Sequence, residues 1–138
     1  MQHQKADILV SIKDTLQTVL PLGGKAILFG SQARGDARAD SDWDILILLD
    51  KPKIEDADYD FVSYPLVELG WSLQIDISPV LYTVKDWLKD HFTPFYHNVQ
   101  QDGIQLAWVS MKKKYLNELT MIKISRELRG YNNNRQRN

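Results

Sequence analysis

Two short apolar runs, separated by a polar segment that begins with glycine, constrain the fold more than any other feature of this chain. Residues 25–29 are apolar after the first lysine and are followed directly by Gly30, a pattern typical of a buried strand. The second run, residues 43–49, is again apolar and is entered through Asp42 and Asp44. The sequence therefore predicts a strand, a turn, a short polar segment and a second strand that opens with two aspartates.

The residues at this turn suit the binding of phosphate and of metal ions. Gly30 lets the backbone turn sharply and approach a ligand, and Ser31 adds a hydroxyl and an N–H that can cradle phosphate oxygens. Because side chains alternate along a strand, Asp42 and Asp44 leave the same face, with their Cα atoms about 6.6 Å apart. Carboxylates at that spacing can hold two cations about 3.5–4 Å apart, as in two-metal phosphoryl-transfer sites, and Mg²⁺ prefers such oxygen ligands.

The spacing of these residues resembles a known family signature. Gly30-Ser31, followed after ten residues by Asp42-Trp43-Asp44, is similar to the motif of the polymerase-beta-type nucleotidyltransferase superfamily. Residues 30–35 together with 41–44 resemble its small stand-alone members, the minimal (MNT-type) nucleotidyltransferases. The resemblance covers roughly residues 5–108. It implies an α+β nucleotidyltransferase fold, in which helices flank a small mixed β-sheet and the catalytic carboxylates share one sheet face.

The resemblance also implies a third carboxylate. The superfamily carries one on a strand that follows the Asp-x-Asp strand, and Asp76 is the acid on a strand-like stretch between Glu68 and Asp86. By itself, an aspartate in such a stretch is more often an exposed strand residue than a ligand. What the resemblance implies is that Asp42, Asp44 and Asp76 hold the metal and form the catalytic set. Asp76 would act as general base or bind the metal beside the attacking hydroxyl.

A nucleotide-binding turn is the next implication of the resemblance. Gly30 and Ser31 would hold the β- and γ-phosphates, and Arg34, just beyond the turn, could add a cationic contact to the triphosphate. A surface salt bridge from Arg34 to Asp36 or Asp40 is an alternative role for this side chain. Two further cations are weaker candidates for the triphosphate contact: Lys25 and Arg38.

The reaction that the resemblance implies is metal-dependent transfer of a nucleoside monophosphate, with AMP from ATP favoured, to an acceptor hydroxyl. Two Mg²⁺ ions would be the cofactors. Family members of this size typically modify a tyrosine on a HEPN-domain partner and so act as antitoxins. Because no histidine follows Arg126, as the toxin signature would require, that partner would be a separate chain. Two alternatives stay open: a small-molecule (aminoglycoside-type) nucleotidyltransferase, and a non-catalytic antitoxin binding module.

Hydrophobic periodicity predicts the remaining elements. Apolar residues at helical spacing favour a helix over residues 4–20 and another over about 55–70, which Pro65 should kink and Gly70 should cap. Strict alternation of apolar and polar residues predicts a strand over residues 71–79. Further helices are expected at about 83–90, at 94–103 and within about 109–129.

These elements suggest three segments. Residues 1–108 would form the nucleotidyltransferase domain, residues 109–130 a C-terminal helix, and residues 131–138 a polar, disordered tail. The C-terminal helix could pack on its own sheet, which is the favoured arrangement, or on another chain. A homo-oligomer therefore stays open.

Charge is distributed unevenly along the chain. Residues 1–111 hold 9 Lys/Arg and 16 Asp/Glu, a net charge of −7, whereas residues 112–138 hold 8 and 2, a net charge of +6. We interpret the basic end as a solvated tail, with docking on an acidic partner as the alternative. Aromatic and basic residues do not interleave along the chain, which disfavours nucleic acid as the acceptor. The absence of cysteine, of a signal-peptide pattern and of a membrane-length apolar run predicts a cytoplasmic protein.

Overall fold

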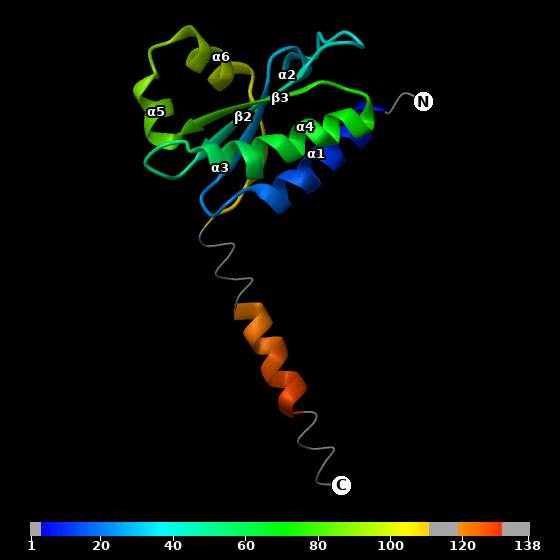
Figure 1. The fold of residues 1–138 in the computed structure, drawn as a ribbon, viewed down its shortest axis with the longest axis vertical. Helices are drawn as coiled ribbons and strands as arrows, with labels where there is room; N and C mark the ends of the chain where they lie inside the picture. Colours follow the sequence, from blue (N-terminus) through cyan, green and yellow to red (C-terminus); the bar gives the residue numbers. More distant parts are fainter. Residues whose placement is uncertain (1–3, 111–118, 131–138) are drawn as a thin grey trace.

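The fold is built on a four-stranded mixed sheet, which the computed structural model shows with helices on both sides (Figure 1). The structure describes residues 4–110 and 119–130. The strands are β1 (Lys25–Phe29), β2 (Trp43–Leu49), β3 (Ile77–Thr83) and β4 (Ile104–Trp108). They lie in the order β3-β2-β1-β4, with β1 antiparallel to β2 and β4, and β2 parallel to β3.

One helix precedes β1, and shorter helical segments connect the strands. They are α1 (Lys5–Val19), α2 (Ser31–Arg34), α3 (Asp56–Asp58), the π-helix η1 (Tyr59–Ser63), α4 (Tyr64–Leu73), α5 (Val84–Lys89) and α6 (Pro94–Asp102). A mixed sheet flanked by helices is the α+β fold that the sequence predicts.

Alternation along β2 divides the hydrophobic core in two. Ile45 and Ile47 are fully buried on the face that packs against α1 and α4. Leu46 is fully buried on the opposite face, where it packs with Trp87 of α5 and Val99 of α6. A one-residue slip of this strand would turn the buried Trp43 outward and exchange its face with that of Asp44, so the register of β2 is fixed.

Several predicted helices are confirmed, and two of them begin at a capping threonine. The helix α1 lies within the range 4–20 expected from its apolar spacing. The hydroxyl of Thr83 accepts a hydrogen bond from the Asp86 N–H at 3.0 Å, and α5 begins directly after it. The hydroxyl of Thr93 accepts one from the Tyr96 N–H at 3.2 Å at the start of α6.

The prediction of a strand over residues 71–79 is wrong over residues 71–76, and the strand that begins at Ile77 continues to Thr83. The helix α4 continues to Leu73, and Gln74, with φ of +59°, ends it in the left-handed region. Gly70, which the sequence suggests as the cap, lies buried inside the helix, where a Cβ would come within 2.8 Å of the Ile75 C=O. Gly70 therefore permits the close return of the chain from α4 towards β3.

The kink expected at Pro65 takes the form of a π-helix. Proline has no N–H to donate to the preceding turn, and its ring clashes with the carbonyl four residues earlier. Here Pro65 lies in the first turn of α4, and the five residues of η1 directly before it adopt the wider π turn. The chain therefore stays helical from α3 through η1 to α4.

The two edge strands of the sheet are β4, which the sequence does not predict, and β3, which contains a proline. The strand β4 was not predicted, because its five residues follow the end of α6 directly and show no clear alternation; only Leu106 and Ala107 in it are buried. At the other edge, Pro79 lies in the middle of β3, in register with Ile45 of β2.

The C-terminal helix does not pack on its own sheet. Residues 119–130 are helical and exposed throughout, and Figure 1 shows them away from the sheet. Packing on the sheet, which the sequence favours, is therefore wrong for these residues, because other helices already pack on both sheet faces. The rest of the expected helix, residues 111–118, and the tail 131–138 lie outside the described residues. Within the described ranges, no helix combines the length and apolarity needed to cross a membrane.

Candidate active site

The start of β2 positions the first two aspartates of the site. Trp43, which lies between them, is 3% exposed and packs into the core beside α1 and α4. Alternation therefore directs Asp42 and Asp44 to the opposite face, as predicted. Asp42 is exposed, and Asp44 is half-buried and paired in register with Phe29 of β1.

Gly30 lies directly against Asp44. It follows Phe29, the last residue of β1, and its φ is +73°, a backbone conformation that residues other than glycine rarely adopt. A Cβ at this position would overlap the carboxylate oxygen Oδ2 of Asp44. Glycine is thus required here for two reasons, its backbone conformation and the close approach of the carboxylate.

Ser31 begins the four-residue helix α2 immediately after this contact. The N–H groups of Ala33 and Arg34 both donate to the Gly30 C=O at 3.1 Å, which closes the turn tightly. Gly35 then ends the helix in the left-handed region. Of the two residues expected to hold phosphates, Gly30 therefore lies beside the carboxylate of Asp44, and Ser31 follows it along the chain.

Burial and charge both act on Asp44. Its partial burial raises the pKa of its carboxyl above the usual range, the neighbouring charge of Asp42 raises it further, and the charge of Arg34 lowers it. Arg34 itself forms an exposed ion pair with Asp36, with 3.4 Å from Nε to Oδ2. The salt bridge expected as an alternative role for Arg34 is therefore present, and the guanidinium still lies near enough to act on Asp44.

Asp76 lies next to the two aspartates along the backbone of the sheet. Its C=O accepts a hydrogen bond from the Trp43 N–H at 2.8 Å, and the parallel register of β2 and β3 pairs Asp44 with Ser78. Asp76 is two residues before Ser78, so alternation places it on the same sheet face as Asp42 and Asp44. Its side chain is exposed.

The donor chemistry of the site fits Mg²⁺. Within residues 4–110 and 119–130, no three Asp, Glu, His or Cys side chains converge into a ready metal cluster. Asp42 and Asp44 are nonetheless close enough for one charge to raise the pKa of the other. A divalent cation would relieve this repulsion with hard oxygen ligands, which Mg²⁺ prefers.

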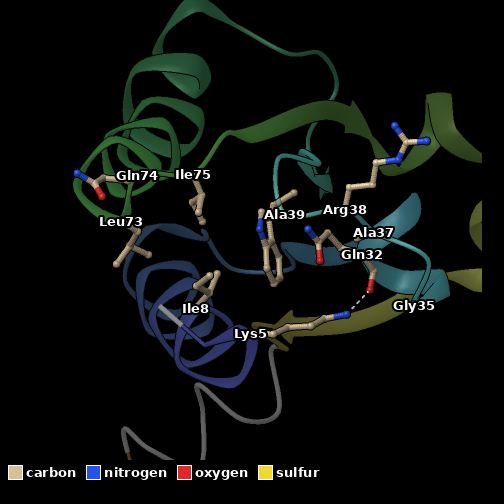
Figure 2. Close-up of a pocket in the computed structure, with 11 residues that line it drawn as sticks. Lys5, Ile8, Gln32, Gly35, Ala37, Arg38, Ala39, Leu73, Gln74 and Ile75 are labelled. Carbon is tan, nitrogen blue, oxygen red and sulfur yellow. Dashed lines mark hydrogen bonds between the residues drawn. The ribbon is translucent and has the colours of Figure 1, made fainter. Parts of the chain in front are cut away.

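Two cavities border the segment that leads into β2. One, of about 410 Å³, is lined by Lys5, Arg38, Trp43 and residues at the end of α4, and by none of the three aspartates (Figure 2). The other, of about 550 Å³, is lined by Asp76 together with Trp71 and neighbouring residues. The weaker candidate Arg38 thus borders the first cavity.

The second weaker candidate, Lys25, lies far from the turn. It begins β1 whereas Gly30 follows the end of that strand, and its ammonium lies 5.0 Å from the ring centroid of Trp108. This cation–π contact, rather than a phosphate contact, accounts for its position.

Two supporting residues were missed by reasoning from the sequence. The Lys5 ammonium donates to the Gln32 C=O at 2.9 Å (Figure 2), which ties α1 to α2. The side chain of Gln32 is buried, and its Nε2 donates to the Ser41 C=O at 3.4 Å. These bonds join the turn to the residue before Asp42. The one sequence feature that could have pointed to Gln32 is its position inside the glycine-serine motif. Hydrophobic periodicity assigns no role to a polar residue there.

Comparison with known proteins gives one family and several structures. The nucleotidyltransferase domain family matches residues 9–104. No curated protein matches this chain. A solved toxin–antitoxin complex with AMP-PNP is 20% identical, over 88% of this chain and 90% of the matched chain, with a TM-score of 0.50. A mutant of the toxin–antitoxin pair MntA–HpeT is 18% identical over the same shares, also with a TM-score of 0.50.

A third solved structure is a tri-AMPylated Shewanella oneidensis HEPN toxin in complex with an MNT antitoxin. It is 18% identical over 92% of this chain and 91% of the matched chain, with a TM-score of 0.47. The likeness in fold rests on the first two structures. The family match spans more than two thirds of the sequence and includes all three aspartates and the glycine-serine turn. The chain belongs to the nucleotidyltransferase domain family.

Proposed function

We propose that this chain is a Mg²⁺-dependent enzyme that moves AMP from ATP to an acceptor hydroxyl in the cytoplasm. The acceptor would be a tyrosine on a HEPN-type toxin encoded as a separate chain, which gives the protein an antitoxin role. One observation supports the proposal most: the Asp44 carboxylate packs against the Gly30 backbone where β1 ends and β2 begins. This places a carboxylate that suits a metal beside a turn that suits phosphates.

The site residues divide into two groups in this proposal. Asp42 and Asp44 would hold two Mg²⁺ ions, with Asp76 completing the set on the acceptor side. When bound, these ions would lower the pKa of the acceptor hydroxyl and neutralise charge on the leaving triphosphate. Gly30 and Ser31 would hold the β- and γ-phosphates.

Arg34 would add a cationic contact to the triphosphate. Its ion pair with Asp36 is exposed, so the guanidinium can leave it at little cost.

The chemical step follows from this arrangement. The acceptor oxygen forms a bond to the α-phosphorus, the bond from that phosphorus to the β-phosphate oxygen breaks, and pyrophosphate leaves. Asp76 takes the proton from the acceptor hydroxyl, since its exposed carboxylate lies at the edge of the site that an incoming side chain can reach.

The choice of nucleotide and acceptor draws on the structures of similar fold. One of them is a toxin–antitoxin complex with AMP-PNP, an analogue of ATP, and another is a toxin–antitoxin pair. A protein acceptor also suits the exposed position of Asp76, which a bulky partner can approach.

The test is transfer of label from α-labelled ATP to the protein encoded by the adjacent gene, in the presence of Mg²⁺. Replacing Asp42 and Asp44 together by Asn should lower the rate by at least about a thousandfold, because metal ions contribute several kcal/mol to such reactions. Asp76→Asn should still bind nucleotide but turn over slowly. Asp14→Asn, an exposed aspartate on α1, is the matched control and should keep full activity.

Two results would favour the alternative functions, a non-catalytic binding module and a small-molecule nucleotidyltransferase. If the Asp42→Asn, Asp44→Asn variant still neutralises the partner fully, the chain acts as a binding module. If label instead appears on an aminoglycoside, the substrate is a small molecule. Undiminished transfer by the double variant would contradict the metal site itself.

A further inference from the structure

The outward face of η1 and α4 combines aromatic and acidic side chains. Phe61, Tyr64 and Trp71 are 73%, 49% and 62% exposed, and helical spacing gathers them on one face. The rings of Tyr64 and Trp71 contact edge-to-face, with centroids 6.0 Å apart and planes at 88°. Asp60 and Glu68 are exposed on the same face. We call these five residues the aromatic–acidic stripe.

The C-terminal helix is exposed on all sides. Its large apolar residues are between 43% and 63% exposed: Leu119, Met121, Ile122, Ile124 and Leu128. A helix of this length is only marginally stable alone in water, and most helices in proteins depend on packing of an apolar face. The apolar residues of 119–130 therefore call for a covering surface.

Charge and length make the two surfaces complementary. The stripe carries two acids, Asp60 and Glu68, and no Lys or Arg, whereas residues 119–130 contain three Lys/Arg and one Glu. At a rise of about 1.5 Å per residue, the stripe runs about 15 Å from Phe61 to Trp71, and the helix runs about 13.5 Å from Leu119 to Leu128. At helical spacing, Leu119 and Ile122 lie on the same face as Arg126 and Arg129, whereas Met121, Ile124 and Leu128 lie on the opposite face. The first of these faces offers apolar residues, and charges opposite to those of the stripe, over a matching length.

We propose that the helix 119–130 of one copy packs on the aromatic–acidic stripe of a second copy. Within a single chain both surfaces are exposed, so the contact is not made inside one molecule. Reciprocal exchange of the two helices gives a closed twofold dimer and satisfies both surfaces at once. This inference does not depend on the proposed catalytic function.

The experiment uses two charge-reversed variants of the full chain, measured by sedimentation velocity. One carries Arg126→Glu with Arg129→Glu, and the other carries Asp60→Lys with Glu68→Lys. Each alone should dimerise at least about tenfold more weakly than the wild type, because like charges then face one another. An equimolar mixture should form the dimer again, since each reversed helix meets a reversed stripe and each wild-type helix meets a wild-type stripe.

A matched control isolates the position of the charges from their number. Lys13→Glu with Lys89→Glu, at exposed sites on α1 and α5, changes the net charge as the arginine pair does and should leave the dimer unchanged. Far-UV circular dichroism checks that every variant is folded.

Three results would overturn the proposal. They are a wild-type chain that stays monomeric throughout the micromolar range, a mixture that fails to dimerise although each variant is folded, and a dimer that persists in both variants alone. The first result would mean that the helix does not dock on a second copy, and the second and third would place the dimer interface elsewhere.

Discussion

At the scale of single residues, the contact between Gly30 and Asp44 decides how the site is built. The carboxylate occupies the space where any other residue would place its Cβ. This pairing could be predicted in part: the motif spacing identified both residues, and alternation gave the face of Asp44. The contribution of Gln32 and Lys5 could not be predicted, because their hydrogen bonds join segments that only the folded chain brings together.

Gly30→Ala should destabilise the fold more than Gly35→Ala. Both glycines have positive φ, +73° and +86°, so each substitution carries a backbone penalty of about 1–2 kcal/mol. At Gly35 nothing lies within 4 Å of the added Cβ, whereas at Gly30 the Asp44 carboxylate must move. The free energy of unfolding in urea should fall by roughly 1–3 kcal/mol more for Gly30→Ala. If both variants lose the same free energy of unfolding, the Asp44 carboxylate moves aside from the added Cβ without cost.

At the scale of elements, local signals located the caps well and the boundary between α4 and β3 poorly. Threonine at 83 and at 93 caps a helix by hydrogen bonds that its own neighbours supply, so sequence suffices to find it. Leu73, by contrast, fits both the alternation of a strand and the helical spacing from Leu66. Packing of Gly70 against the returning chain decides between these patterns, and that contact is not local.

The start of α3 provides a test by pH. Burial alone raises the pKa of the Asp58 carboxyl, but the hydrogen bonds from Lys51 and the Glu55 N–H, with the charge of Lys51, outweigh it and hold this pKa below the usual value. Ionised Asp58 therefore stabilises the fold above about pH 4, and this contribution is lost as the pH falls through its lowered pKa.

Asp58→Asn should accordingly lower the free energy of unfolding at pH 7 by about 1 kcal/mol, the usual contribution of a helix cap. The difference from the wild type should shrink as the pH falls below 4. Asp56→Asn, an exposed acid in the same turn, serves as the control. A deficit of the same size at pH 7 and pH 3 would contradict the electrostatic origin of the effect.

At the scale of the whole molecule, one strand joins two cores. The strand β2 sends Ile45 into the layer beneath α1 and α4, and Leu46 into the layer beneath α5 and α6, while its first residues carry the aspartates. The α+β class and the shared face of the aspartates could be predicted from periodicity and motif. The exposed C-terminal helix could not, because terminal helices usually pack on their own domain.

Because both layers depend on β2, the two cores should unfold together. Ile45→Ala and Leu46→Ala should each lower the free energy of unfolding by about 2–5 kcal/mol, since both side chains are fully buried. Tryptophan fluorescence and far-UV circular dichroism should report the same urea midpoint for each variant. Separate midpoints for the two probes would show that the layers unfold independently.

Pro79 in the edge strand β3 has a consequence for how other chains can approach. Proline offers no amide hydrogen, and within sheets it is confined to edges, where the missing donor faces outward. An extended peptide laid alongside β3 would leave one of its carbonyls unpaired, so this border resists fibril-like growth of the sheet. Any protein that reaches the aspartates from this side must therefore be recognised through side chains rather than by adding a fifth strand.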